Sequence, residues 1–116
     1  MKVINISEVD KNKVTMDGAE KVLKQIPISS KDSTPNFSLR VFTVEPDGFT
    51  PYHKHEYEQL NYIIEGEGVL INEKGEEKSL KKGDFALVLP NEMHQYKNRA
   101  ADKPFVFICG VPKEFE

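Results

Sequence analysis

Short apolar segments separated by turn-forming residues fill this sequence from Phe37 onward, and this pattern limits the fold more than any other feature. The segments recur about every 8 to 12 residues, which is typical of small all-β sandwiches and barrels. They are expected at 37–45, 58–64, 69–72, 77–80, 85–89, 94–98 and 105–111. Glycine, proline, asparagine and aspartate cluster between them, as turns require. We therefore predict an all-β domain of roughly eight short strands.

The N-terminal third is less regular and ends in the polar loop 29–36. Apolar residues between 22 and 28 fit an extended segment, and a helical turn over 19–24 is the alternative. Pro27 disfavours a helix through this region. We expect residues 1–35 to form an arm that packs on the barrel or on a partner subunit, and residues 36–116 to form the barrel.

Two of the expected strands, 85–89 and 105–109, are continuously apolar. Such strands are typically buried on both faces. One face can line the barrel interior, so the other must pack on a second sheet, on the arm or on a partner subunit. This pattern is consistent with a homodimer.

Composition excludes several classes of function. The formal net charge is −3 over 116 residues, and Arg40 and Arg99 are the two arginines, which argues against nucleic-acid binding. No apolar stretch is long enough to span a bilayer or to act as a signal peptide. Cys109, the single cysteine, excludes an internal disulfide and is expected to be a small buried apolar residue. We expect a cytoplasmic protein.

The three histidines of the chain suggest a metal site. His53 and His55 are two residues apart, so an extended strand projects both imidazoles from one face. Gln59 has the same parity, and His94 begins a later strand that a barrel can bring beside the first. Three imidazoles and one oxygen suit Fe, Mn, Co, Ni, Cu or Zn rather than Ca or Mg. A bulge would exchange Gln59 for Glu58 as the oxygen ligand.

Segment 48–66 resembles the first motif of the cupin family, G-x5-H-x-H-x3,4-E-x6-G. His53 and His55 supply the histidine pair, Gln59 stands where the family usually has glutamate, and Gly66 closes the motif.

Segment 83–98 resembles the second cupin motif, G-x5-P-x-G-x2-H-x3-N. Gly83 opens it, Leu89 and Asn91 stand at the first proline and the glycine, and His94 and Asn98 occupy the histidine and asparagine positions. Asn98 is expected to shape the backbone rather than to react.

The chain departs from these motifs at several positions. Asp47 stands at the position of the opening glycine, and Gly48 follows one residue later. This departure, like Leu89 and Asn91, affects the geometry of a turn and not a ligand. Asparagine in particular tolerates a left-handed conformation. Gln59 is the chemical departure, since an amide oxygen coordinates without adding charge. A neutral ligand set would leave the ion its full +2 charge, favour an anionic substrate and weaken metal affinity. The alternative is a cupin that has lost its metal.

The resemblance implies a single cupin jelly-roll barrel, a double-stranded β-helix, that commonly pairs as a dimer. It also implies a metal-dependent enzyme of the dioxygenase or decarboxylase kind, with His53, His55, His94 and Gln59 as ligands and a small oxygen-rich molecule as substrate. The chain shows no dedicated base, which weakens an isomerase. A non-catalytic small-molecule binding or sensor module is the alternative; a structural zinc site is disfavoured, because a barrel of this size folds without metal.

Three further residues are candidates for the pocket. Tyr96 shares parity with His94 and is the candidate catalytic acid or hydrogen-bond donor, or it simply fills the barrel mouth. Asn61 shares parity with Gln59. Arg40 lies in a strand that is apolar on both faces, so it either forks onto a substrate carboxylate or lies at the surface or at a dimer interface.

Overall fold

The computed structural model describes residues 1–116, and nearly all of its regular structure is β-strand, as predicted. The strands are β1 (Asn12–Lys13), β2 (Glu20–Ile28), β3 (Phe37–Phe49), β4 (Gln59–Glu65), β5 (Glu67–Ile71), β6 (Glu77–Lys81), β7 (Phe85–Val88), β8 (Gln95–Lys97) and β9 (Phe105–Pro112). Short 3₁₀ helices cover Ile6–Glu8, Ser30–Asp32 and Lys113–Phe115. No helix has the length and apolar character needed to cross a membrane.

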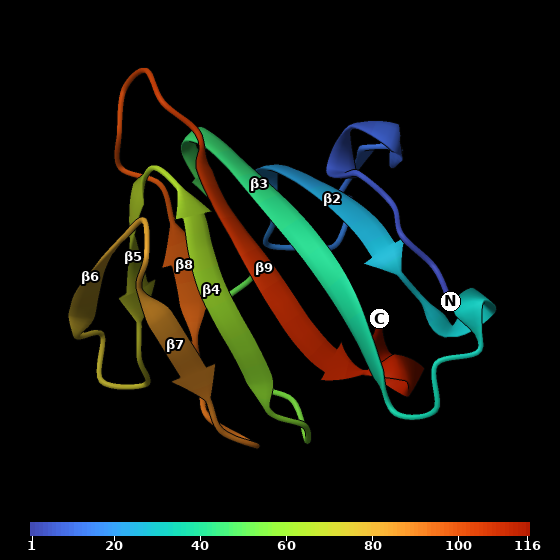
Figure 1. The fold of residues 1–116 in the computed structure, drawn as a ribbon. Helices are drawn as coiled ribbons and strands as arrows, with labels where there is room; N and C mark the ends of the chain where they lie inside the picture. Colours follow the sequence, from blue (N-terminus) through green and yellow to red (C-terminus); the bar gives the residue numbers. More distant parts are fainter.

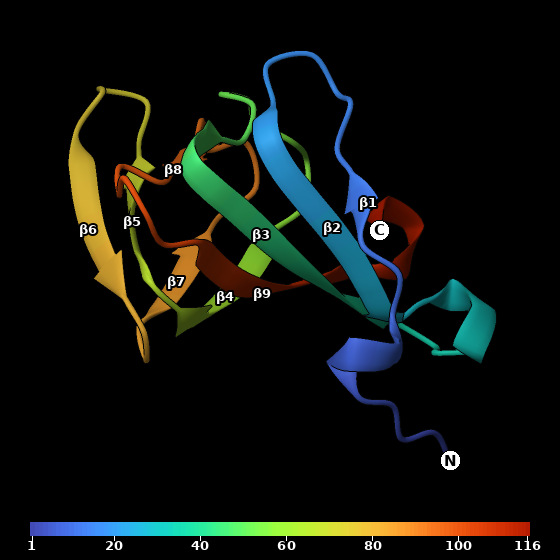
Figure 2. The same ribbon diagram turned by 90° about the horizontal axis from the view of Figure 1, so that it is seen from above.

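The strands form one antiparallel sheet that curls into an open barrel. Its order is β6-β5-β8-β3-β9-β4-β7, and β2 and β1 are added on the other side of β3. The long strand β3 makes the curl possible, because it pairs with β9 along 37–44 while its end, Phe49, pairs with Lys97 of β8. β8 therefore joins the end of β3, and β5 and β6, which continue from β8, lie apart from β2 and close the other side of the barrel (Figures 1 and 2).

The extended alternative for the N-terminal third is correct, and the helical turn over 19–24 is wrong. β2 pairs with β3 of the same chain, for example Val22 with Val44 and Lys24 with Phe42. The register shifts between Gln25 and Ile28, around Pro27. Proline lacks the N–H that a ladder requires, so it is found at such irregularities. The division of the chain at residue 35 stays a prediction.

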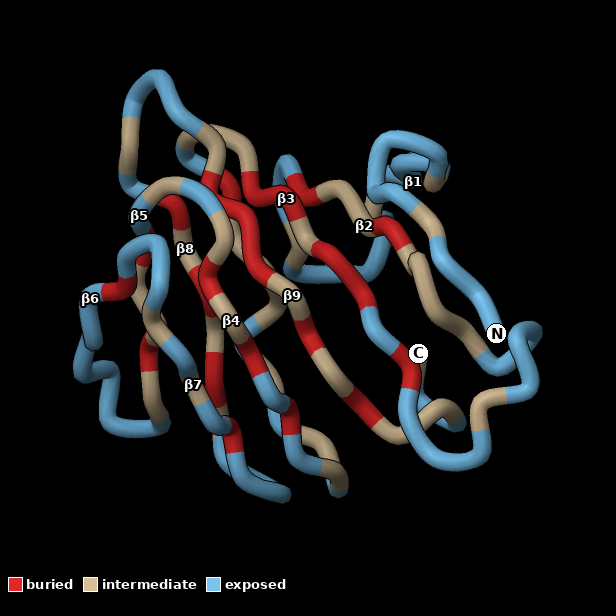
Figure 3. Tube along the Cα trace, in the orientation of Figure 1, coloured by how far each residue is buried: buried red, intermediate tan, exposed pale blue.

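The core lies inside the curl. Buried positions follow the middle of β3, β9 and β4 (Figure 3). β9 is buried on both faces, as predicted, over Phe105, Val106 and Phe107, which are all below 10% exposed. Farther along the strand, Ile108 and Gly110 on its outer face are partly exposed. The same prediction is wrong for β7 in the single chain, where Phe85 is 80% and Leu87 55% exposed. The chain has no further layer over this face of the sheet.

Two of the motif departures have left-handed backbones. Asp47 and Asn91 have φ of 65° and 66°. Both stand where the family has glycine, so these positions keep the turn conformation although they have a side chain, as expected for Asn91.

Candidate metal centre

The two histidine-bearing segments lie side by side in the barrel. His53 and His94 form an isolated antiparallel bridge, with backbone hydrogen bonds of 3.2 and 2.9 Å in the two directions. Beyond it, the Thr50 amide donates to the Tyr96 carbonyl at 2.9 Å. This pairing joins residues about forty positions apart and sets the two motifs face to face.

The side chains of the three histidines converge. The ring nitrogens of His53, His55 and His94 that could serve as ligands lie within 4.8 Å of one another. The ring centres are 4.8 to 5.3 Å apart. Every histidine of the chain therefore belongs to one cluster.

Backbone carbonyls orient two of the rings. Nδ1 of His55 lies 2.7 Å from the Tyr57 carbonyl, and Nδ1 of His94 lies 2.9 Å from the Glu92 carbonyl. A carbonyl only accepts, so each Nδ1 carries the proton and Nε2 is left as the ligand atom. Metal-binding histidines are commonly oriented in this way.

A hydrogen-bond chain orients the Gln59 amide. Asn61 Nδ2 donates to the Ile108 carbonyl at 3.3 Å, which directs its Oδ1 into the barrel. This Oδ1 accepts from the Tyr96 hydroxyl at 2.6 Å and from Gln59 Nε2 at 3.3 Å. Gln59 Oε1 is thereby turned to His55 Nε2, 2.9 Å away.

This arrangement tests whether the residues fit a metal ion. A neutral imidazole has one N–H, and in His55 it is used by the Tyr57 carbonyl. The lone pair of Nε2 then faces the lone pairs of Gln59 Oε1. A cation bound by both atoms removes the conflict. Three imidazole nitrogens and an amide oxygen are suitable donors for a first-row divalent ion, so the residues fit one.

The surroundings keep two of these imidazoles neutral, which is the form that binds metal. Burial, with smaller contributions from His94 and His55, lowers the pKa of His53 to about 4. Burial also lowers the pKa of His94, against the opposing effect of its hydrogen bond to the Glu92 carbonyl.

The structure separates the two candidates for the oxygen ligand. Gln59 is 7% exposed and contacts His55, whereas Glu58 is exposed. No bulge exchanges them. That Gln59 acts as a ligand stays a prediction.

Tyr96 is 1% exposed and donates to Asn61 rather than to open space. Burial raises the pKa of its hydroxyl, and its ring packs on Phe107 with centres 4.4 Å apart. Tyr96 is therefore placed to orient Gln59 through Asn61. Asn98, in turn, shapes the backbone by donating to the carbonyls of Val44 and Lys103.

The sequence leaves open whether the Arg40 side chain points into the barrel or outward. In the structure it points into the barrel and is 8% exposed. Its Nη2 donates to Cys109 Sγ at 2.9 Å. Cys109 is fully buried, and burial raises the pKa of its thiol, in keeping with a small apolar residue.

A cavity of about 190 Å³ adjoins the histidines, and several residues that line it were not singled out from the sequence. They are Lys24, Phe42, Tyr57, Phe107, Phe115 and Glu116. Tyr57 shares parity with His55 and could have been found that way; its ring stacks on His55 at 3.9 Å and on Phe115 at 4.2 Å. Phe115 and Glu116 follow β9 and have no periodic signal.

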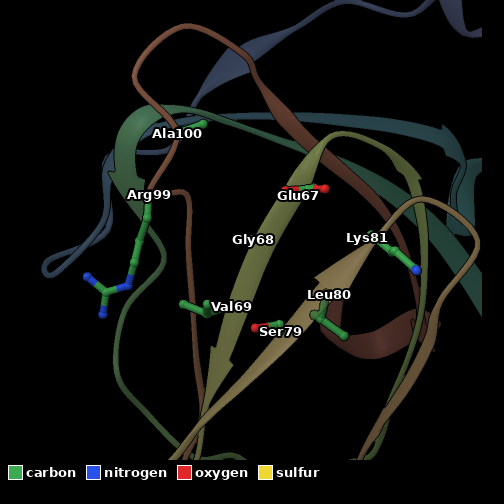
Figure 4. A pocket seen from close by; sticks show the side chains of 8 residues that line it. All are labelled: Glu67, Gly68, Val69, Ser79, Leu80, Lys81, Arg99 and Ala100. Atoms are coloured by element: carbon green, nitrogen blue, oxygen red, sulfur yellow. The ribbon is translucent and has the colours of Figure 1, made fainter.

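A larger hollow of about 570 Å³ lies away from the histidines, along β5, β6 and Arg99 (Figure 4). Val69, Ser79 and Leu80 are among the residues that line it, and the lining contains no histidine or cysteine. Arg99 is already paired with Glu77 at 2.6 Å. The chemistry therefore gathers at the smaller, histidine-lined cavity.

The curled antiparallel sheet and the inward-facing histidine triad define a small β-barrel protein with one candidate metal centre. Residues 40–111 match the family model of the cupin domain. The chain belongs to the cupin family.

Relatives of known name share parts of this chain. A gentisate 1,2-dioxygenase of a Streptomyces species is 27% identical over 79 residues, which cover 68% of this chain and 22% of that enzyme. The chain thus spans about a fifth of the length of the gentisate dioxygenases that it matches.

Solved structures match nearly the whole chain. The polyketide cyclase RemF from Streptomyces resistomycificus superposes with a TM-score of 0.92 at 26% identity, covering 97% of this chain and 80% of RemF. A predicted oxalate decarboxylase from Thermotoga maritima superposes with a TM-score of 0.85 at 22% identity, covering 96% and 98% of the two chains. The latter likeness supports the fold alone.

Proposed function

We propose that this cupin is a metal-dependent enzyme that acts on a small oxygen-rich molecule by dioxygenase-like or decarboxylase-like chemistry. The convergence of all three histidines within 4.8 Å, beside a cavity, carries the proposal. The match to gentisate dioxygenases supports the reaction class.

Each residue of the centre has a role in this proposal. His53, His55 and His94 hold a divalent ion from Fe, Mn, Co, Ni, Cu or Zn, with Gln59 as the fourth ligand. The ion supplies Lewis-acid or oxygen-activating chemistry. Asn61 and Tyr96 hold the Gln59 oxygen toward the centre. The cavity contains no imidazole outside this set, so the chain offers no free histidine as a base.

Elemental analysis of protein purified without a histidine tag or chelator tests the metal site. We expect about one equivalent of a transition metal in the wild type and less than a tenth of that in His94→Ala. Gln95→Ala changes the first residue of β8, directly after His94, and as the matched control it should keep its metal. Equal metal content in His94→Ala and the wild type, with both proteins folded by circular dichroism, would refute the proposed site.

Oxygen uptake and carbon dioxide release then separate an enzyme from a binding module. The metal-loaded protein is assayed with gentisate, catechol and oxalate, and we expect turnover of at least one that His94→Ala lacks. The alternative is a non-catalytic sensor, and it is favoured if a compound raises the melting temperature of the loaded protein without being converted.

A further inference from the structure

Arg40 is a buried cation without a counterion. It is 92% buried, and neither of the two salt bridges of the chain includes it. Its Nη2 contacts a neutral thiol, its guanidinium carbon lies 5.0 Å from the centre of the Phe42 ring, and its buried Nε has no hydrogen-bond partner. Burying a charge and an N–H donor without partners is costly, which makes Arg40 a candidate partner for an anionic ligand.

Arg40 lines the same cavity as His53, Gln59 and His94. Lys24 also lines it and forms no salt bridge. The single acidic residue of the lining is Glu116, whose carboxylate already accepts hydrogen bonds from Ser30 and Ser38. These hydrogen bonds leave the charge of the Glu116 carboxylate in place, and it acts on Lys24. Two cations therefore face one carboxylate, and the lining keeps a net positive charge.

The other walls are aromatic. Phe42, Tyr57, Phe107 and Phe115 line the cavity beside the two cations. A space of about 190 Å³ with such walls suits one ring or a short apolar body that carries a single anionic group. A planar carboxylate matches the guanidinium geometry, whereas a highly hydrated dianion does not match these walls.

We propose that Arg40, assisted by Lys24, binds the carboxylate of a small aromatic monocarboxylic acid that occupies this cavity. The inference rests on the proposed function only for the statement that the ligand is a substrate. The binding step itself depends on Arg40, with Lys24 beside it, and needs no metal. Arg40 selects the ligand by its charge, and the aromatic walls select its body.

Isothermal titration of the metal-free protein with benzoate and its neutral isostere benzamide tests this inference. We expect the wild type to bind benzoate at least tenfold more tightly than benzamide, and Arg40→Gln to lose this preference while its affinity for benzamide is unchanged. Arg99→Gln replaces the other arginine, which lies outside the cavity, and should match the wild type. A preference that survives in Arg40→Gln, its absence in the wild type, or tighter binding of inorganic phosphate would overturn the proposal.

Thermal melting of Arg40→Met separates ligand binding from a structural role. Because Arg40 has no counterion among the side chains of the protein, we expect the melting temperature of Arg40→Met to equal or exceed that of the wild type, with no further rise on adding benzoate. A lower melting temperature together with no benzoate-induced rise in the wild type would show that Arg40 is structural. Metal content, measured as above, should not change in Arg40→Gln and should fall in His94→Ala. The metal site and the carboxylate site are therefore tested by different variants, and one proposal can fail while the other holds.

Discussion

Gln59 sets the charge of the proposed centre. Three neutral imidazoles and a neutral amide give an ion no compensating charge, and Gln59 Oε1 already faces His55 at 2.9 Å. Gln59→Glu places a carboxylate there, and its attraction to the ion should exceed the cost of burying it. We expect affinity for Co²⁺ or Zn²⁺ to rise roughly tenfold or more, about 1.4 kcal/mol, measured by competition with a chromophoric chelator.

Glu58→Gln is the control for this prediction, because Glu58 is the exposed neighbouring carboxylate. Its affinity for the ion should match that of the wild type. Weaker binding by Gln59→Glu would contradict the assignment of the fourth ligand, and weaker binding by Glu58→Gln would transfer that role to Glu58.

Among the elements, the link between β4 and β5 depends on a close backbone approach at Gly66. Its φ is +77°, and a Cβ there would lie 2.1 Å from the Pro104 carbonyl oxygen. Gly83 also has a positive φ, of +96°, but nothing lies within 4 Å of its would-be Cβ. Gly83→Ala therefore isolates the cost of the backbone conformation, about 1–2 kcal/mol.

We expect Gly66→Ala to cost about 2–4 kcal/mol, since overpacking against the backbone adds to the same conformational cost. Urea unfolding of both variants measures the difference in the free energy of unfolding. Equal losses in the two variants would show that the contact with Pro104 is relieved by movement of the loop.

Much at the scale of elements is predictable from the sequence, because side-chain parity and turn residues act locally. The period of two predicts that His53, His55 and Gln59 face the same way, and the family motifs place His94 beside them. The side chains do converge, although bends at 56–57 interrupt the expected strand and β4 begins only at Gln59. The inward direction of Arg40 is different: β3 is apolar on both faces, and its parity is decided by pairing with β9 more than sixty residues away. Phe115 reaches the cavity through a 3₁₀ turn after β9, and no local pattern encodes such a contact.

At the scale of the whole molecule, an apolar face remains open. It spans β7, β4 and β9 in register, with Leu87, Leu60 and Gly110 in one row and Phe85, Tyr62 and Ile108 in the next. Leu39 of β3 continues the first row, whereas Val41, beside Ile108, is only 6% exposed and is already covered. Phe85, Leu87 and Leu60 are 80%, 55% and 54% exposed. The two rows contain no charged residue, so a second copy of this face meets no like charge when it packs on itself.

We therefore predict a homodimer through this face, which would bury the side of β7 that the single chain leaves exposed. Sedimentation velocity should show a dimer at micromolar concentration. Leu60→Lys combined with Leu87→Lys places cations on two neighbouring strands of the face. Because a two-fold axis brings these like charges together, we expect the dimer to weaken at least tenfold, or about 1.4 kcal/mol. Val3→Lys adds a cation at a residue that is 95% exposed in the N-terminal segment, and it should leave the dimer intact. A monomeric wild type, or a dimer that persists in the double variant, would assign this face to another role.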